Sequence, residues 1–537
     1  MKTEKDLNVT FLGVNPVLTD KQGDMLNPQQ VVAISSLATF KGKAIKDLVS
    51  DIEKQGQSLN DKTQTILQKS ALRGHASLST TPTISFTYQG TKFIDSAVTG
   101  MIFSSSLMSS GRRTDTTHDD IIIPSDIERN KAAKEIYLES SKKLIDVFNE
   151  FLRIGIPKDE VSKIYQYGIY GTGIINLPLE SIIALKKEYE REIDWMPKEI
   201  GLLIQKIEQE LKRCGLDLLY ATREVAPRNF YPYPNIFKNP KKPNLAVELK
   251  RVYKTNGVKS KVFDLHIIPS TGLRKQMLVL GKLSDITMGN LAKTKKNWKQ
   301  LLELRQDIVR DYNSVMSFKV LSCVPWRVWG DKKRHRTVPQ SVQSIYDAVD
   351  RSSKIFLKHK NQIDKGNISI NLIKDIEKVY SVPPTIRSKK DILQKYLQTV
   401  GEAFASYNKL LKLKIKPNDA IFLIPRGVKL DILQTYDLYN FITGYYPLRI
   451  CSTAEEELRR VAWDEVCQIK ELLKQKGYIW LAKFIIPKCK IVGFCPEQKF
   501  CPIASTFANK RYNEQYHKAM QEELFSEYQN KLKNLGK

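Results

Sequence analysis

The sequence has 537 residues, a formal net charge of +28 and 42% hydrophobic residues. This length exceeds what one hydrophobic core usually serves, so we expect two or more domains. No stretch is apolar enough to span a membrane and no signal-peptide core is present, which predicts a cytoplasmic protein. Seven cysteines in a chain this long argue against a secreted disulfide scaffold. The excess of Lys and Arg would suit a phosphorylated small molecule or a nucleic acid.

The first half of the chain is predicted to be mainly helical, with few strands. Alternating and β-branched residues predict strands at 8–13 and 83–88. Apolar residues at helical spacing predict the other elements, which are helices over 29–56, 58–73, 93–107, 126–154, 160–170, 179–190 and 197–214.

A proline-rich segment divides the chain. Residues 227–243 carry five prolines, which exclude a continuous helix or a central strand. We interpret this segment as a linker between a first domain at 1–226 and a second domain at 244–537.

The second half is also predicted to contain long helices and short strands. Strand-like patterns occur at 245–253 and 261–268. Helical periodicity predicts helices over 295–321, 390–413 and 430–443.

Two windows in the chain resemble each other. FNEFLRIGIPKDEV begins at Phe148, and YNKLLKLKIKPNDA begins at Tyr407. Each closes a long predicted helix, passes a proline and enters a helix that carries an aspartate. Further along, Arg191 and Arg449 each precede a Glu-rich helix that ends at a glycine. These coincidences predict two structurally related halves.

Two basic segments are candidate binding sites. Residues 109–113 (SSGRR) combine hydroxyls, a glycine and guanidinium groups, which suits a phosphate, although a flexible Ser/Gly loop is an equally open interpretation. Arg334, His335 and Arg336 could bind a phosphate or an electron-rich ring, or could form a solvated basic helix start.

Arg449 is a third candidate. Ser452 and Glu455 are spaced as a capping box, so we expect a helix to start there with Arg449 just before it. An arginine beside a helix N-terminus favours a negative or developing negative charge. An ion pair between Arg449 and the following glutamates is the alternative.

No metal site is expected. Cys489, Cys495 and Cys501 are evenly spaced, but their spacing is not that of a zinc finger, and a fourth ligand is not obvious. The six histidines are scattered. The chain also lacks a Walker loop, a dinucleotide-binding glycine pattern and a serine nucleophile elbow.

These segments together resemble the flavin-dependent thymidylate synthases, and more closely a tandem form of that family. GHASLSTTPTISFTYQG and SSSLMSSGRRTD in the first half are similar to the family's Gly-His-x-Ser, strand and Ser-Gly-Arg pattern. In the second half, RHR and PLRICSTAEEELRR are similar to its Arg-His-Arg and Leu-Arg segments.

The resemblance implies an α+β fold of two tandem related domains, each with long helices on a small antiparallel sheet. It implies methylene transfer from methylenetetrahydrofolate to dUMP, with reducing equivalents from NADPH carried by FAD. It also implies residue roles: the dUMP phosphate at Ser110, Gly111 and Arg112, the uracil at Arg449, and the flavin at Arg334, His335, Arg336, His75 and Ser77.

The sequence also departs from the family pattern. Gly100 to Ile102 stand where the first half would have its own Arg-His-Arg, Met108 stands where a glutamate is expected, and Arg113 replaces a tyrosine. Three hypotheses remain: an enzyme with a site composed from both halves, a flavin- or nucleotide-binding relative with altered chemistry, and an inactive homologue that binds nucleic acid. The first is favoured, with a homodimer replacing the family tetramer and no membrane association.

Overall fold

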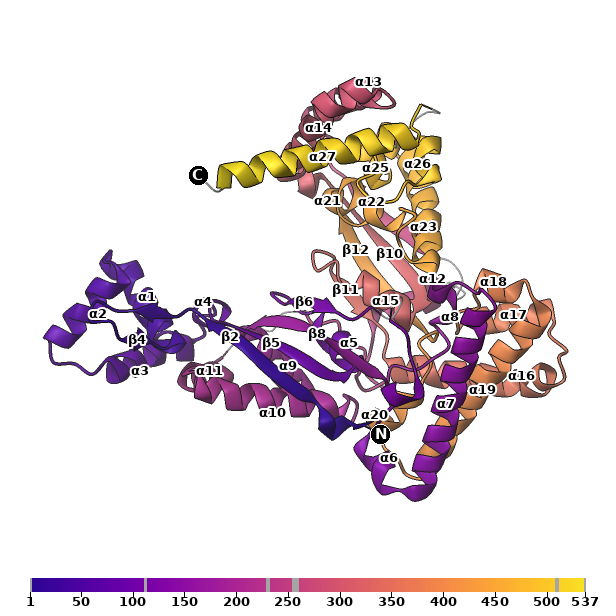
Figure 1. Ribbon diagram of the computed structural model, residues 1–537, viewed down its shortest axis with the longest axis horizontal. Helices are drawn as coiled ribbons and strands as arrows, with labels where there is room; N and C mark the ends of the chain where they lie inside the picture. The colour runs from indigo at the N-terminus through magenta and orange to yellow at the C-terminus, as the bar shows by residue number, and fades with distance from the viewer. Residues whose placement is uncertain (1, 111–113, 228–231, 254–259, 508–510, 536–537) are drawn as a thin grey trace. The chain divides into compact units, whose positions relative to one another are not determined.

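The computed structural model describes residues 2–110, 114–227, 232–253, 260–507 and 511–535 (Figure 1). It forms two compact units, and each unit draws on several separate parts of the chain. The predicted boundaries at 1–226 and 244–537, by contrast, are continuous in sequence, and they stay a prediction. The first unit contains Met1–Pro243, Pro325–Arg336 and Val342–Leu430, and the second contains Asn244–Val324, Thr337–Ser341 and Asp431–Lys537.

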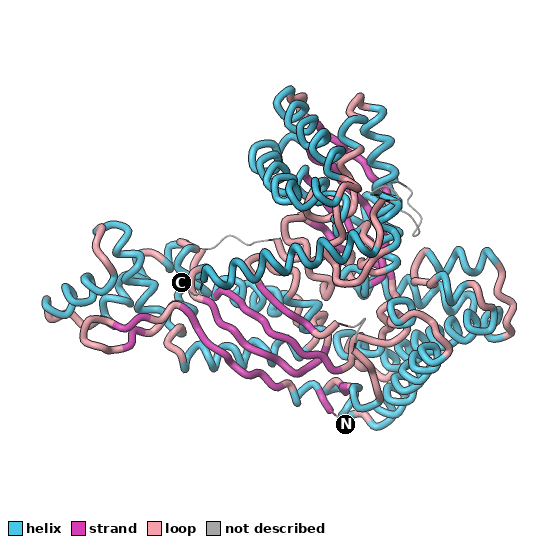
Figure 2. The backbone as a smooth tube through the Cα atoms, turned by 45° about the horizontal axis from the view of Figure 1, so that its top comes forward, coloured by secondary structure: helices cyan, strands magenta, loops and turns pink. Residues whose placement is uncertain are grey.

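The fold is α+β, as predicted. The first unit contains a four-stranded antiparallel sheet in the order β2-β5-β8-β6. Its central pair runs in register from Thr83 opposite Pro178 to Thr91 opposite Tyr170. Helices α9 and α10 lie along one face of this sheet (Figures 1 and 2). The bounds are β2 Asn8–Asn15, β5 Thr83–Thr91, β6 Ser105–Met108, β8 Tyr170–Pro178, α9 Leu179–Arg191 and α10 Lys198–Arg213.

A helical layer accompanies the sheet of the first unit. The long helices α7 and α19 pack side by side, and α16 packs on α19 (Figure 1). Asn130 starts α7 because its side chain accepts a hydrogen bond from the backbone N–H of Ala133. The remaining helices of the unit are α1 Pro28–Lys41, α2 Ile45–Lys54, α3 Leu59–Lys69, α4 Ser77–Thr80, α5 Phe93–Val98, α6 Ser125–Arg129, α7 Lys131–Arg153, α8 Lys158–Val161, α11 Asp217–Val225, α15 Trp326–Lys332, α16 Ile345–Asp364, α17 Ile370–Glu377, α18 Pro384–Arg387, α19 Lys390–Lys412 and α20 Pro417–Ala420, and its short strands are β1 Lys2–Thr3, β3 Leu18–Thr19, β4 Met25–Leu26 and β7 Ile122–Ile123.

An aromatic cluster lies in the core of the first unit and joins residues from both halves of the chain. Phe93 contacts Trp326 and Phe422, with ring centroids 5.7 and 4.6 Å apart. Tyr167 stacks on Trp326 at 4.1 Å. Such rings bury large apolar areas and favour tilted or offset contacts, so this cluster holds the two halves together within one core.

The second unit contains another four-stranded sheet, in the order β11-β12-β10-β9. Its buried core includes Phe318 and Tyr436, whose rings stack at 5.5 Å. Among the described residues, no helix of either unit is long and apolar enough to cross a membrane. The elements are β9 Lys261–Ile267, β10 Met316–Pro325, β11 Gln340–Val342, β12 Lys429–Asp437, α12 Leu245–Tyr253, α13 Thr271–Thr287, α14 Leu291–Tyr312, α21 Leu438–Ile442, α22 Tyr446–Arg449, α23 Glu456–Gln475, α24 Ile479–Ala482, α25 Lys488–Val492, α26 Pro502–Phe507 and α27 Glu514–Leu535.

The two windows that resemble each other in sequence also have the same local structure. A helix of 23 residues, a helix of 4 and a strand of 9 follow one another as α7, α8 and β8, and again as α19, α20 and β12. The two sheets are also alike, because β9, β10, β11 and β12 take the places of β2, β5, β6 and β8. This likeness supports the two-repeat prediction.

Several sequence predictions are confirmed, and others are wrong for identifiable reasons. The strands near 8–13, 83–88 and 261–268 and the helices near 197–214 and 390–413 are present. Residues 245–253 are helical rather than extended, because the side chain of Asn244 accepts hydrogen bonds from the N–H groups of Ala246 and Val247 and so starts α12.

Four segments that were predicted to be helices are wholly or partly strand or turn. The segment 430–443 begins as β12, because most of its residues are buried and it lies between two strands of the sheet. In the segment 295–321, the helix α14 ends at Tyr312 and the strand β10 begins at Met316. The segment 93–107 forms α5 and then β6, and little of 160–170 is helical. In each case, an apolar run without strong periodicity did not distinguish helix from buried strand or turn.

A buried carboxyl fixes the end of β5. The backbone N–H of Thr91 donates to Glu199 Oε1 at 2.7 Å, and the Thr91 hydroxyl pairs with the other carboxyl oxygen. Burial raises the pKa of Glu199 to about 8, from an ordinary 4.5. At pH values between 4.5 and about 8, Glu199 keeps its proton in the folded chain and loses it in the unfolded chain. This contribution to stability is therefore complete below about pH 4.5 and is lost as the pH rises through about 8.

Replacing Glu199 with glutamine should remove this pH dependence. The glutamine can keep both contacts with Thr91 and carries no charge to bury. We expect the variant to gain stability over the wild type by roughly 1.4 kcal/mol for each pKa unit of the shift, at pH 8 and above but not near pH 4.5. Urea unfolding at the two pH values measures this difference, and an equal difference at both would contradict the buried-acid interpretation.

Candidate functional site

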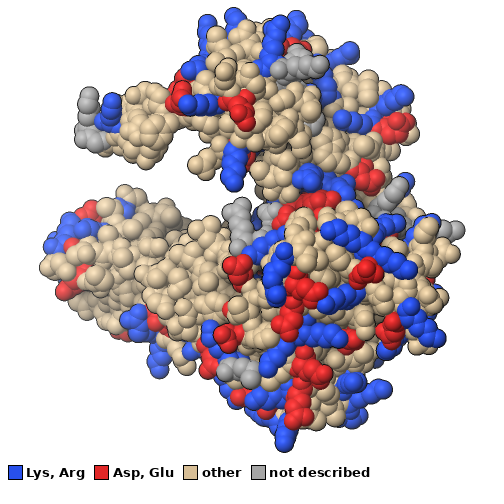
Figure 3. Space-filling view, turned by 45° about the vertical axis from the view of Figure 1, so that its right-hand side comes forward, with Lys and Arg blue, Asp and Glu red and all other residues tan. Residues whose placement is uncertain are grey.

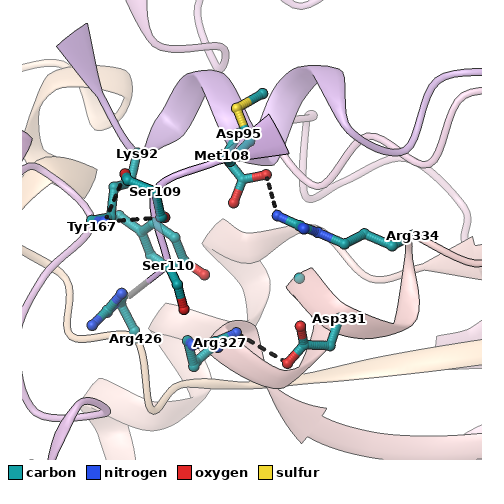
Figure 4. A pocket seen from close by; sticks show the side chains of 11 residues that line it. Lys92, Asp95, Met108, Ser109, Ser110, Tyr167, Arg327, Asp331, Arg334 and Arg426 are labelled. Atoms are coloured by element: carbon teal, nitrogen blue, oxygen red, sulfur yellow. Dashed lines mark hydrogen bonds and ion pairs between the residues drawn. The ribbon is translucent and has the colours of Figure 1, made fainter. Parts of the chain in front are cut away.

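A cavity of about 270 Å³ opens in the first unit (Figure 4). Residues from widely separated parts of the sequence form its wall. Most of them are polar or charged, which is unusual for a space enclosed by a protein core. The lining residues are Lys92, Asp95, Met108, Ser109, Ser110, Tyr167, Arg327, Gly330, Asp331, Arg334 and Arg426.

Equivalent strands of the two sheets place two of the cations. Lys92 directly follows β5, and its backbone N–H donates to the carbonyl oxygen of Ile169 at 3.2 Å. Trp326 directly follows β10, and its backbone N–H donates to the carbonyl oxygen of Val428 at 2.7 Å. Arg327 comes next in α15. The same turn, made after the same strand in each half of the chain, thus directs a cation into the cavity.

A second pair of equivalent positions supplies Tyr167 and Arg426. Each lies shortly before the last long strand of its half, β8 or β12, and the two segments form a bridge between Gln166 and Pro425. The guanidinium of Arg426 lies 3.7 Å from the ring centroid of Tyr165 and 5.4 Å from that of Tyr167. These cation–π contacts hold a buried arginine in place.

Arg426 is buried, and the hydrogen bonds within the described residues do not use all of its donors. Its Nη2 donates to the carbonyl oxygen of Ser162 at 2.8 Å, but its Nε is buried without a hydrogen-bond partner among the described residues. Burial and the nearby Arg327 lower the pKa of Arg426. A negatively charged ligand in the cavity would offset the burial of this charge.

The cavity has an excess of positive charge. Four cations line it, namely Lys92, Arg327, Arg334 and Arg426, against the two carboxylates of Asp95 and Asp331. Arg334 Nη2 lies 3.5 Å from Asp95 Oδ1, and Arg327 Nη1 lies 3.3 Å from Asp331 Oδ2 (Figure 4). The carboxylates thus orient two arginines, and the remaining charge favours an anionic ligand.

Lys92 is the most deeply buried lysine of the cavity wall, with 5% of its surface exposed. Its Nζ lies 3.3 Å from Ser109 Oγ. Burial, followed by repulsion from Arg426, lowers the pKa of Lys92 to about 7. A lysine with this pKa gains its proton when an anion binds beside it near neutral pH.

The structure brings together two residues that the sequence singled out in different halves. Ser110 and Arg334 both line the cavity. Gly111 and Arg112 lie outside the described residues. Arg336 does not line the cavity, and its Nε donates to the carbonyl oxygen of Thr99 at 3.3 Å.

The remaining predicted flavin contacts lie elsewhere on the first unit. His335 is half-buried, and His75 and Ser77 are exposed near the start of α4. None of these three lines the cavity. Their assignment to a flavin stays a prediction.

Arg449 belongs to the second unit, where it is the last residue of α22 and half-buried. The predicted capping box is wrong, because α23 begins later and Glu455 is its N-cap. The side chain of Glu455 accepts from the backbone N–H of Leu458 at 2.8 Å, and Ser452 lies before this cap. The role of Arg449 toward uracil stays a prediction.

The sequence interpretation missed most of the charged wall. Lys92, Arg327 and Arg426 were not singled out. The sequence did contain one indication of Arg426. Tyr167 and Arg426 lie at the same distance after the two windows that resemble each other. Extending the repeat comparison past the helices would have paired them.

Basic and acidic side chains are mixed on part of the surface (Figure 3). On the face shown in Figure 3, Lys and Arg are interleaved with Asp and Glu. Ion pairs between α7 and α19, such as Lys395 with Glu150 and Lys143 with Glu402, also place the two kinds of charge side by side. A dispersed pattern gives this face no continuous track for a polyanionic backbone.

Comparison with known proteins connects part of the chain to one family. Residues 296–473 match the family described as thymidylate synthase complementing protein. The flavin-dependent thymidylate synthase of Pyrococcus abyssi is 28% identical over 150 residues, which cover 28% of this chain and 59% of that protein. The enzyme of the same name from Sulfurisphaera tokodaii is 32% identical over 130 residues, covering 23% and 46%.

The matched region spans about half the length of these relatives. The chain is thus similar to flavin-dependent thymidylate synthases over part of its length, in agreement with the resemblance seen in the sequence, and the family model matches residues 296–473. This region includes Arg327, Arg334, Arg426 and Arg449, but the part of the cavity wall around Lys92 and Ser110 lies outside it.

One solved structure is similar in outline. The UMP/dUMP methylase PolB from Streptomyces cacaoi, bound with 5-Br dUMP, aligns with 42% of this chain and 98% of its own, at 9% identity and a TM-score of 0.32. A likeness at this TM-score is too weak to assign a function.

Proposed function

We propose that the protein is a flavin-dependent thymidylate synthase-like enzyme that methylates dUMP to dTMP. One observation carries the proposal: Ser110 and Arg334, expected from the sequence to serve one site, line a single cavity with Lys92, Arg327 and Arg426. Guanidinium, ammonium and hydroxyl donors converging on one space are the groups that bind a phosphate monoester.

The size of the cavity defines which part of a ligand it would hold. At about 270 Å³ it is slightly smaller than typical small-molecule sites, which are roughly 300–1,000 Å³. It therefore suits the phosphate and sugar of a mononucleotide, not the whole of FAD. The excess of positive charge in the cavity wall fits such a phosphate.

Each part of the wall has a role in this proposal. Arg426 and Lys92 bind the phosphate oxygens deep in the cavity, while Ser110 donates from its hydroxyl. Arg334, held by Asp95, closes the more exposed side. FAD, when bound, supplies the hydride chemistry that reduces a methylene to a methyl group, and NADPH and methylenetetrahydrofolate are the proposed co-substrates.

We also propose that the chain is a tandem of two related repeats and acts as a cytoplasmic homodimer. The shared strand order of the two sheets and the equivalent positions of Tyr167 and Arg426 support the repeats. A divergent homologue that binds flavin, nucleotide or nucleic acid without thymidylate synthesis is the alternative.

Absorbance spectroscopy of the purified protein tests the proposal. We expect flavin bands, or their appearance on FAD addition, and a perturbation of those bands by dUMP. Arg334→Ala should weaken dUMP binding by about 10- to 100-fold, since a hydrogen bond to a charged group contributes roughly 1.5–3 kcal/mol. The control is Arg129→Ala, an exposed arginine of the same unit that should leave binding unchanged.

The outcomes separate the alternatives. Flavin binding with thymidylate formation supports the enzyme. Flavin or dUMP binding without turnover supports the divergent homologue. Salt-dependent retention on nucleic acid, without flavin or dUMP binding, would overturn the proposal.

A further inference from the structure

Four cysteines surround one small cavity in the second unit. Cys489, Cys495 and Cys501 come from the evenly spaced C-terminal run, and Cys451 comes from the loop after α22. The cavity has a volume of about 110 Å³. Its other walls are mostly apolar, formed by Ile450, Ser452, Arg459, Trp463, Pro487, Ile503 and Ala504. The structure thus supplies the fourth cysteine that the sequence spacing left unidentified.

The loops that carry these cysteines are fixed in position. Gly493 ends α25 with a φ of +86°, a conformation that favours glycine, and so turns the chain between Cys489 and Cys495. The backbone N–H of Cys495 donates to the Tyr512 hydroxyl at 2.9 Å, and the carbonyl oxygen of Cys495 accepts from Gln521 Nε2 at 3.0 Å.

The C-terminal segments form a separate small core around this region. Phe494, Cys495, Tyr512, Tyr516 and Met520 are buried together, with Cys489 and Cys501 packed against them. An arrangement in which several thiols are held by a dedicated core is expected of a structural ligand set rather than of incidental cysteines.

The thiols are not paired with one another as disulfides. All seven cysteines lie among the described residues, and all are free. Four thiols therefore face one cavity, and they would release their protons on binding a metal cluster.

A cluster fits this arrangement better than a single ion. A zinc ion requires its sulfur ligands at about 2.3 Å from one point. In the part of the chain that the structure describes, no group of three or more His, Cys, Asp and Glu side chains is placed to hold one metal ion. In a [4Fe–4S] cluster each cysteine instead binds a different iron, so the sulfurs surround a volume and do not converge.

The polar groups of the cavity suit the net negative charge that a cluster has together with four thiolate ligands. Arg459 lines the wall, and its Nη1 donates to the carbonyl oxygen of Ser452 at 3.0 Å. The Thr453 hydroxyl lies 3.4 Å from Cys451 Sγ, and the Ser452 hydroxyl lies 3.1 Å from Cys501 Sγ. Hydroxyl donors and a cation near the sulfurs stabilise thiolates and tune a bound cluster.

From these observations we propose that Cys451, Cys489, Cys495 and Cys501 bind a [4Fe–4S] cluster. The site lies in the second unit and does not depend on the proposed thymidylate synthase activity. It differs from our expectation from the sequence that no metal site is present.

The test begins with the full-length wild-type protein. It is purified without oxygen and reconstituted with ferrous iron and sulfide. We expect about four iron atoms and four sulfide ions per chain, and an electron paramagnetic resonance signal of a cluster after reduction. One iron or less per chain, or stoichiometric binding of zinc alone after parallel loading, would overturn the proposal without any variant.

Single serine variants then assign the ligands. Cys451→Ser, Cys489→Ser, Cys495→Ser and Cys501→Ser should each lose most of the bound iron and the signal. Cys467→Ser is the matched control, because Cys467 is exposed on α23 and does not line the cavity. Full iron content in Cys451→Ser would overturn the four-cysteine assignment, as would equal loss in the control.

Discussion

Replacing Lys92 with methionine is expected to weaken dUMP binding by about 10- to 100-fold. Lys92 is buried in the cavity wall beside Ser109, and a hydrogen bond from a charged group contributes roughly 1.5–3 kcal/mol. The unbranched methionine fills similar space, so the fold should be retained. Isothermal titration calorimetry measures the change.

The same variant should be more stable than the wild type near neutral pH. Burial lowers the pKa of Lys92 to about 7, whereas an unfolded lysine keeps its proton to about 10.5. At pH values between about 7 and 10.5, Lys92 is protonated in the unfolded chain but mostly neutral in the folded chain. Its burial therefore destabilises the fold fully below about pH 7, and this destabilisation decreases as the pH rises toward 10.5. Lys92→Met removes this destabilisation, because methionine carries no charge.

The pH dependence of binding gives a second readout. An anion favours protonated Lys92, so the affinity of the wild type for sulfate should fall as the pH rises through about 7, while the affinity of Lys92→Met should not. Lys238→Met is the matched control, since burial lowers the pKa of Lys238 to about 8 but this lysine is not part of the wall. Equal loss of affinity in both variants would contradict the assignment.

Replacing Arg223 with methionine is expected to lower the free energy of unfolding by about 3–5 kcal/mol. Arg223 and Glu180 form an ion pair in the first unit, and each is only 1% exposed. Arg223 Nε and Nη2 lie 3.2 Å from the two oxygens of Glu180. Removing the arginine leaves a carboxylate that is buried without its counter-charge.

A double variant distinguishes the pair from its surroundings. Glu180→Leu combined with Arg223→Met should recover most of the lost stability, because the unpaired charge is gone. Arg213→Met is the control, since Arg213 forms an exposed pair with Glu210 and should change stability far less. Chemical denaturation compares the four proteins, and a double variant no better than Arg223→Met alone would refute the argument.

The class of fold and part of the site could be predicted from the sequence. Two segments show why other elements could not. The helix at 390–413 has an uninterrupted 3.6-residue pattern, so it was predicted almost to the residue. Residues 430–443 have no such pattern, because β12 is buried on both faces and its apolar run resembles that of a buried helix.

The site residues that lie in short segments rich in polar and basic residues were predicted. Those that are isolated in the sequence were missed. Ser110 and Arg334 lie in short basic segments that are visible in one window. Arg426 is an isolated arginine whose importance comes from its contacts with Tyr165 and Tyr167, which only the fold creates. Cys451 could likewise not be connected with Cys489 before the chain was folded.

The discontinuous make-up of the first unit has a consequence for its synthesis. The ribosome releases Lys92 and β5 early, but the unit is not complete until Leu430 has emerged. Until then, α7 lacks its partner α19, and buried residues of α7 such as Leu144 and Phe148 lack part of their cover. The apolar surface that α7 buries against α19 therefore stays uncovered until α19 has been synthesised, and such surface is prone to aggregation.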